Sequence, residues 1–122
     1  MKNDALTQIQ KLGIETSIDP TVLDLASRDA SLFHVQPEVV VTPRSEDELR
    51  QIVNIVATQK ASQPTLSVTA RSAGTDMSGG PLTESMVINM TKHFNNISSV
   101  DKKTKTAVVE PGVFYKDFEK QF

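Results

Sequence analysis

The stretch TARSAGTDMSGG, residues 69–80, places small side chains on both sides of a single Asp-Met pair. This composition does not favour a helix, and only its first three residues suit the end of a strand. Small residues let the backbone adopt positive φ angles and let a ligand approach the main chain closely. The stretch therefore predicts a loop whose successive peptide N–H groups form a nest for an anion, and phosphate is the usual anion in such nests.

The segments around this loop predict strands and a helix. PEVVVTP, residues 37–43, is a continuous apolar run between prolines, which is typical of a strand buried on both faces. A helix is expected next, because Ser45 and Glu48 form a capping-box pattern before an apolar periodicity of 3.6 residues. TLSVTA (65–70) and SMVINMT (85–91) read as two further strands. Strand, helix and strand in this order predict a right-handed βαβ unit, with the loop at the carboxyl end of its second strand, where ligands gather.

The remaining segments predict helices at the start of the chain and a hairpin near its end. Leu6, Ile9 and Leu12 recur at helical spacing before Gly13, and Asp19-Pro20 marks the start of a second short helix. Residues 96–112 contain two short apolar stretches around a polar turn, as in a β-hairpin. The fold class expected is therefore α/β (α+β): a small parallel sheet flanked by helices, plus a hairpin. We expect a helical lead-in over residues 1–36 and the sheet-containing unit over 37–122.

The last residues place aromatic side chains at a spacing of four. Phe114, Phe118 and Phe122 would form one stripe along a helix, and no glycine, proline or polar tail follows them. We read this as a chain that stops inside a domain. The stripe then predicts self-association, since uncovered apolar surface tends to find a partner.

Composition excludes several kinds of function. Thirteen basic and fifteen acidic residues give a net charge of −2, which is too balanced for a nucleic-acid surface. The absence of cysteine rules out disulfides and thiolate metal sites, and His34 and His93 lack a metal-binding spacing, so no metal site is expected. No segment resembles a signal peptide or a membrane span, which favours a cytoplasmic protein.

Within the loop, Arg71 offers a fixed positive charge, and Ser72, Thr75 and Ser78 offer hydroxyl groups. Asp76 would repel a phosphate unless its side chain turns outward or onto the loop backbone. The spacing of the glycines fits neither the Walker A loop nor the G-x-G-x-x-G fingerprint. A surface loop without a ligand remains an equal alternative on composition alone.

The other polar clusters are better explained by structure than by chemistry. His34 and His93 are expected on the surface or in turns, and the acids at residues 46–48 are expected to cap a helix. The lysines of the hairpin turn, Lys102, Lys103 and Lys105, are expected to be solvated. None of these residues is a catalytic candidate.

Four blocks in order give a resemblance to a known family: residues 28–53, the loop at 69–80, MVINMTKHFNNI (86–97) and AVVEPGV (107–113). Together they resemble the start of the FAD-binding domain of the FAD-linked oxidases, the PCMH-type superfamily. The resemblance implies that the chain is the first subdomain of such a domain and grips the FAD pyrophosphate. Implied cofactor-binding residues are Pro43, Arg71, Ser72, Ala73, Gly74, Thr75, Asp76, Ser78, Gly79 and Gly80. Pro111 and Gly112 match a turn that approaches the cofactor in that family.

The resemblance also implies a function for the longer enzyme. Thr75 stands where some relatives carry a histidine bonded to the flavin, so FAD is expected to bind non-covalently. Asp29 and Ser31 favour the branch of D-lactate and glycolate dehydrogenases, whose substrates are 2-hydroxy acids. No catalytic residue is expected within this chain. Two alternatives remain: a non-catalytic module that docks on another chain, and a small binder of phosphate or nucleotide.

Overall fold

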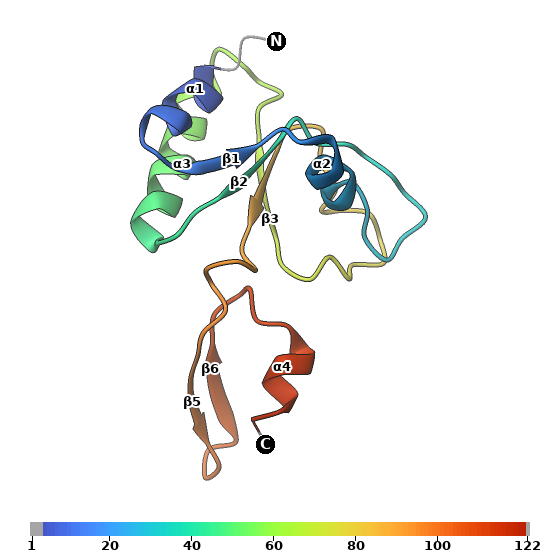
Figure 1. Cartoon of the computed structure of the whole chain (residues 1–122), viewed down its shortest axis with the longest axis vertical. Helices are drawn as coiled ribbons and strands as arrows, with labels where there is room; N and C mark the ends of the chain where they lie inside the picture. Colours follow the sequence, from blue (N-terminus) through green and yellow to red (C-terminus); the bar gives the residue numbers. More distant parts are fainter. Residues whose placement is uncertain (1–3, 122) are drawn as a thin grey trace.

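The computed structural model describes residues 4–121 and forms three layers around one mixed sheet (Figure 1). The sheet consists of β1 (Glu15–Ser17), β2 (Val39–Thr42), β3 (Val68–Arg71) and β4 (Met86–Asn89). Its helices are α1 (Asp4–Lys11), α2 (Pro20–Ala26) and α3 (Glu46–Gln59). A second sheet, a hairpin of β5 (Ile97–Asp101) and β6 (Thr106–Val109), is followed by α4 (Tyr115–Glu119).

The strand order of the main sheet is β1-β2-β4-β3, and β2, β4 and β3 run parallel to one another. The parallel strands expected on either side of α3 are confirmed, and β4 lies between them. Strand β1 was not predicted. Its sequence, Glu-Thr-Ser, has no apolar alternation, and it forms because its backbone pairs antiparallel with the edge of β2. The segment expected to hold only helices therefore also contributes an edge strand.

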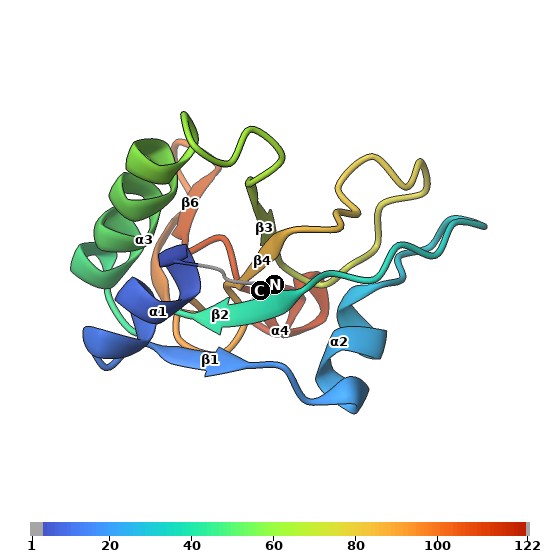
Figure 2. The same cartoon turned by 90° about the horizontal axis from the view of Figure 1, so that it is seen from above.

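The apolar residues of β2 explain the layers, because adjacent side chains on a strand point to opposite faces. Val39 and Val41 pack with Ile9 of α1 and Ile52 of α3 in the larger core cluster. Val40 faces the other way and packs against α2 in a smaller cluster with Leu23, Ala26 and Val87. Figure 2 shows α1 and α3 on one side of the sheet and α2 on the other. The expectation that β2 is buried on both faces is confirmed.

The helix ends follow their sequence signals. The carboxylate of Asp19 accepts a hydrogen bond from the N–H of Thr21 at 2.9 Å and caps α2. The Ser45 hydroxyl accepts from the N–H of Glu48 at 3.2 Å and caps α3. The capping box is completed differently from the prediction, because the Glu48 carboxylate accepts from the N–H of Arg44, at 2.8 Å. An ion pair between the same two side chains favours this choice.

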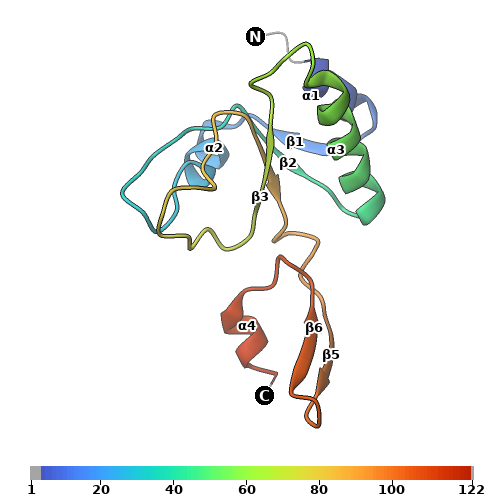
Figure 3. The ribbon, with the colours of Figure 1, turned by 180° about the vertical axis from the view of Figure 1, so that it is seen from behind.

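The hairpin and α4 lie beyond one edge of the main layers (Figure 3). Strands β5 and β6 pair antiparallel, and the Asp101 carboxylate accepts from the N–H of Lys103 at 2.8 Å in the turn. The expected aromatic stripe is only partly a helical feature. Phe114 precedes α4 as its N-cap residue, Phe118 lies within α4, and Phe122 lies outside the described residues. Within residues 4–121, no helix combines the length and apolar character needed to cross a membrane.

Candidate functional site

The connection between β3 and β4, residues 72–85, contains neither helix nor strand. Neighbouring parallel strands are usually joined through a helix, so this connection is unusual. Loops of this length without secondary structure are uncommon in compact domains and often serve a function. Figure 1 shows it projecting beside the segment that links α2 to β2, and a 2.8 Å hydrogen bond from the Ala30 N–H to the Asp76 carbonyl joins the two.

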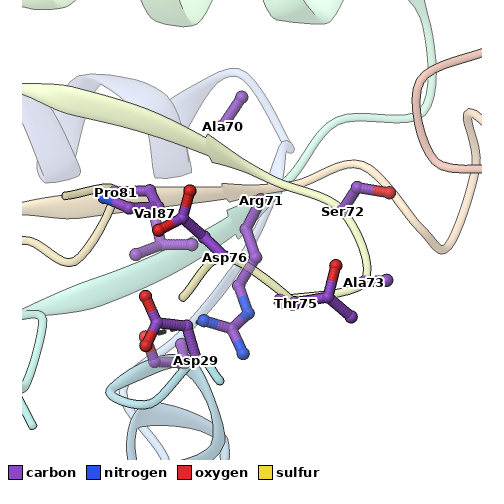
Figure 4. Close-up of a pocket in the computed structure, with 11 residues that line it drawn as sticks. Asp29, Ala70, Arg71, Ser72, Ala73, Thr75, Asp76, Pro81 and Val87 are labelled. Carbon is purple, nitrogen blue, oxygen red and sulfur yellow. Dashed lines mark hydrogen bonds between the residues drawn. The ribbon is translucent and has the colours of Figure 1, made fainter. Parts of the chain in front are cut away.

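A cavity of about 320 Å³ lies under the first half of this loop. It opens where β3 ends and is bounded by α2 and by the apolar side chain of Val87 (Figure 4). Six residues expected at the site line it: Arg71, Ser72, Ala73, Gly74, Thr75 and Asp76. The predicted loop thus borders a cavity, and the position of this cavity at the carboxyl end of parallel strands is where ligands bind in such sheets.

The peptide N–H groups of residues 72–75 donate no hydrogen bond to any acceptor in the described part of the chain. Within this arc Gly74 has a φ of +70°, which turns the backbone into the left-handed region that other residues avoid. Successive N–H groups around such a turn converge on one side, as in an anion-binding nest. Residues 72–75 therefore form an arc of free donors, which we call the amide arc.

The Arg71 side chain lies beside the amide arc. In Figure 4 it descends from the end of β3, with Thr75 and Ala73 to one side and Asp29 to the other. Its Nη1 donates a long hydrogen bond of 3.4 Å to the carbonyl of Ala26, which leaves the remaining donors of the guanidinium for another acceptor. The guanidinium also occupies the space where a side chain at position 74 would begin. Two features therefore favour glycine at position 74: its positive φ angle, and the space that the Arg71 guanidinium occupies.

In the second half of the loop, two of the peptide N–H groups donate to side chains of the loop itself. The N–H of Ser78 donates to the Asp76 carboxylate at 2.7 Å, and the N–H of Gly80 donates to the Ser78 hydroxyl at 3.1 Å. Neither Ser78, Gly79 nor Gly80 lines the cavity. The structure therefore separates these three residues from the six that surround it, although the sequence placed all of them at the cofactor.

The same bonds determine the orientation of the Asp76 carboxylate. Its carboxylate turns onto the loop and accepts from both the N–H and the hydroxyl of Ser78, the latter at 2.5 Å. These bonds stabilise the ionised form and lower the pKa of Asp76 below its ordinary value. The carboxylate is thereby held against its own loop while the residue still lines the cavity.

Pro43 and the turn at residues 111–112 lie elsewhere. Pro43 follows β2 with its side chain fully buried, and it lines neither the cavity nor the groove beside it. Gly112 packs against the main chain instead. Its N–H donates to the carbonyl of Phe94 at 2.7 Å, and a side chain there would collide with the carbonyls of Met90 and Phe94. A need for glycine at 112 is therefore explained by packing without a ligand.

Sequence reasoning missed Asp29 as a cavity residue. It was noted only as a mark of one branch of a family, yet its side chain lines the cavity with Ala26, Pro81 and Val87. A signal was present in the sequence, because DAS at residues 29–31 repeats the D-x-S spacing of DMS at 76–78. The two histidines take no part: His34 is exposed and 3.7 Å from Asp24, and His93 lies outside the cavity.

A second hollow of about 510 Å³ continues from the first along the face of α2. It shares Ala26, Val87 and residues 71–73 with the first and extends to Leu25 and Phe114. Its additional lining is mostly apolar. The amide arc thus stands between a smaller cavity of mixed polar and apolar lining and a larger, mostly apolar groove.

Known proteins resemble this chain in sequence. The family model described as FAD binding domain matches residues 37–122, which is more than half of the chain. The glycolate oxidase subunit GlcD of Bacillus subtilis is 33% identical over 86 residues, covering 70% of this chain and 17% of that protein. D-2-hydroxyglutarate dehydrogenase of Escherichia coli is 31% identical over 87 residues, covering 71% of this chain and 8% of that protein. The chain thus spans less than a fifth of either relative.

Solved structures share the fold at low sequence identity. Alkyldihydroxyacetonephosphate synthase superposes with a TM-score of 0.79 at 16% identity, over 99% of this chain and 25% of that one. The 4-ethylphenol oxidase of Gulosibacter chungangensis superposes with a TM-score of 0.78 at 21% identity, over 97% of this chain and 23% of that one. The expected fold class is confirmed by these likenesses.

Proposed function

Because this chain belongs to the family of FAD binding domains, we propose that the amide arc and Arg71 hold the diphosphate of non-covalently bound FAD. The observation that carries the proposal is the set of peptide N–H groups at residues 72–75, which have no acceptor in the described part of the chain. These residues are exposed or half-buried beside the cavity, so their donors are accessible to an anion that enters it, which supports the proposal.

The chemistry of the residues fits this cofactor. A diphosphate offers oxygens on two adjacent phosphates, and Arg71 can meet them with parallel N–H donors. The apolar groove next to the arc offers a surface to an aromatic ring system, while the cavity offers polar groups. Thr75 carries a hydroxyl group, which forms no covalent bond of the kind a histidine forms with flavin. The resemblance alone predicts that FAD also contacts Pro43, Ser78, Gly79 and Gly80.

For the longer protein we propose an oxidoreductase that acts on a 2-hydroxy acid. The support is that both relatives named above carry such a substrate in their names, glycolate and D-2-hydroxyglutarate. FAD, when bound, supplies the redox chemistry by accepting a hydride from the substrate. The residues of this chain then bind and orient the cofactor, and no catalytic residue is assigned within it.

The test is a titration of the chain with FAD, followed by flavin fluorescence and by the ¹H–¹⁵N spectrum of the protein. We expect saturable binding and flavin that is released unmodified by denaturation, since no covalent bond holds it. Flavin that stays with the denatured chain would contradict the non-covalent part of the proposal. A folded chain that binds neither FAD nor ADP would contradict the whole of it.

An exposed apolar surface supports a second candidate, a module that docks on another copy or another chain. Val108 and Val109 of β6, Phe114 and Tyr115 are all exposed, and Tyr115 is 73% exposed. We propose that this surface drives self-association of the isolated chain. Sedimentation should show dimers or larger species at high concentration, and Tyr115→Lys should shift them toward monomer. A monomer at all concentrations would remove the support for this candidate.

A further inference from the structure

Two segments with the same pattern of hydrogen bonds lie against each other at the rim of the cavity. They are DASLF (29–33) and DMSGG (76–80). In each, the aspartate carboxylate accepts from the N–H of the serine two residues later, at 2.7 Å in both. In each, the serine hydroxyl then accepts from the N–H two residues further on, at 3.1 Å in both. The two segments are therefore folded alike, each around its own aspartate.

The packing of these segments fixes both carboxylates beside the cavity. The Ala30 N–H donates to the Asp76 carbonyl at 2.8 Å, and the ring of Phe33 fills the space where a side chain at Gly79 would begin. Asp29 and Asp76 both line the cavity. Both pKa values are lowered, in each case chiefly by the hydrogen bond with the following serine, so both groups are ionised near neutral pH. The charge of Asp76 opposes the ionisation of Asp29, which indicates that the two groups are close.

The cavity therefore carries more negative than positive side-chain charge. Its ionisable lining residues are Asp29, Arg71 and Asp76. The amide arc attracts an anion, and Arg71 adds one positive charge, but two carboxylates oppose any further negative charge. An arrangement of this kind attracts a phosphate of low charge and rejects one of high charge.

Phosphates differ in charge according to whether they are internal or terminal. Each phosphate of an internal diphosphate diester, as in FAD, carries a single negative charge. A terminal phosphate monoester carries close to two charges at pH 7.5, because its second pKa is about 6. The additional charge lies on the outer phosphate, and the two carboxylates of the same cavity oppose it.

Resting on the function proposed above, we propose that Asp29 and Asp76 are specificity-determining residues, which select an internal diphosphate diester and discriminate against terminal phosphates. The arc and Arg71 supply attraction, and the paired carboxylates supply repulsion toward the wrong ligand. FAD contains such an internal diphosphate, so the amide arc and Arg71 attract it and the carboxylates do not reject it. ADP and FMN end in a phosphate monoester, so the amide arc and Arg71 attract them but the carboxylates repel them.

The test uses two ligands that differ by one methyl group and one charge: ADP and its β-methyl ester. Their affinities for the whole chain are measured at pH 7.5 by ¹H–¹⁵N chemical-shift titration, which detects weak binding. The variants are Asp76→Asn and Asp29→Asn, because an asparagine Oδ1 keeps the acceptor that each turn needs. Asp24→Asn is the matched control, since Asp24 is an exposed acid of α2 that does not line the cavity.

We expect the unmodified chain to bind the methyl ester more tightly than ADP. Each cavity variant should raise the affinity for ADP relative to the ester by about three- to tenfold, because one opposing charge is removed. The Asp24→Asn control should leave this ratio within about twofold. Asp76 is exposed, so the spectrum of its variant should stay native even if Asp29→Asn perturbs the fold.

The outcomes separate this inference from the proposed function. Binding of both ligands with a ratio that neither cavity variant changes would overturn the role of the carboxylates and leave the anion site intact. Binding of neither ligand by the native chain would overturn the proposed function and this inference with it. A shift in the ratio that Asp24→Asn reproduces would show that only the net charge matters, which also overturns the inference.

Discussion

The two halves of one loop behave differently although both are made of small residues. In residues 72–75 the peptide N–H groups have no acceptor within residues 4–121, whereas in residues 76–80 those of Ser78 and Gly80 donate to nearby side chains. The cause is local. The second half begins with an aspartate followed by a serine, and such side chains accept from the backbone two residues later. No aspartate precedes the first half, so its donors stay available. The position of Asp76 therefore decides which half of the loop can bind an anion.

Distortion of the amide arc should reduce the affinity for FAD more than any other change. Gly74→Val places a side chain at a φ of +70° and in the space of the Arg71 guanidinium, so it distorts the arc and displaces the charge together. We expect the affinity for FAD to fall by about a hundredfold, the sum of two losses of about 1–2 kcal/mol each. Gly80→Ala is the matched control in the second half, because its φ is not positive. Native affinity in Gly74→Val, measured by flavin fluorescence, would show that the arc is placed wrongly.

Removal of the guanidinium alone should have a smaller effect. Arg71→Met keeps the length of the side chain and loses its charge, and the lower end of the range for hydrogen bonds to a charged group, about 1.5 kcal/mol, applies to this half-exposed arginine. We expect FAD affinity to fall by about tenfold or slightly more. Arg28→Met, a change at an exposed arginine outside the cavity, serves as the control. Equal losses in both variants would indicate a general effect of charge.

The hydrogen bonds within residues 76–80 can be removed without a change in residues 72–75. Asp76→Ala removes the acceptor of the Ser78 N–H, so hydrogen exchange at that amide should accelerate by about fivefold, corresponding to a bond of about 1 kcal/mol. Asp76→Asn should restore most of the protection, because its amide oxygen still accepts. The amides of residues 72–75 should exchange fast in all three proteins. Protection at those amides in the native chain would contradict the contrast between the halves.

The smallest effect concerns pH. Hydrogen bonds to Ser78 lower the pKa of Asp76 below 3.8, so its contribution to the folded loop is complete above that value. The contribution is lost as the pH falls through the lowered pKa. The Ser78 amide shift should therefore titrate with a midpoint below 3.8, and Asp76→Asn should abolish the transition. A midpoint above 3.8 would mean that the carboxylate does not accept these bonds in solution.

Periodicity and capping signals were sufficient for most of the fold. The buried run at β2 and the cap at Ser45 identified the strand and helix that carry the sheet, because both signals are local. Strand β1 escaped prediction since Glu15, Thr16 and Ser17 show no pattern of their own and depend on pairing with β2. The position of β4 between β2 and β3 is likewise a tertiary property that no local signal contains.

The sequence indicated which loop borders the cavity, but only some of the residues that line it. The small residues and Arg71 pointed to the loop, but the prediction did not separate the residues that line the cavity from residues 78–80. That outcome depends on side-chain rotamers within the loop. Asp29 was missed as a cavity residue because it is far from the loop in sequence and is brought to it by tertiary contacts, such as that between Ala30 and Asp76.

The most direct test of the central claim is a ¹H–¹⁵N titration of the chain with FAD. The account predicts that the amides of residues 72–75 shift strongly on saturation, in the direction of stronger hydrogen bonding, while those of Ser78 and Gly80 stay near their initial positions. Shifts confined to residues 78–80, or absent from the whole loop while FAD binds elsewhere, would contradict it.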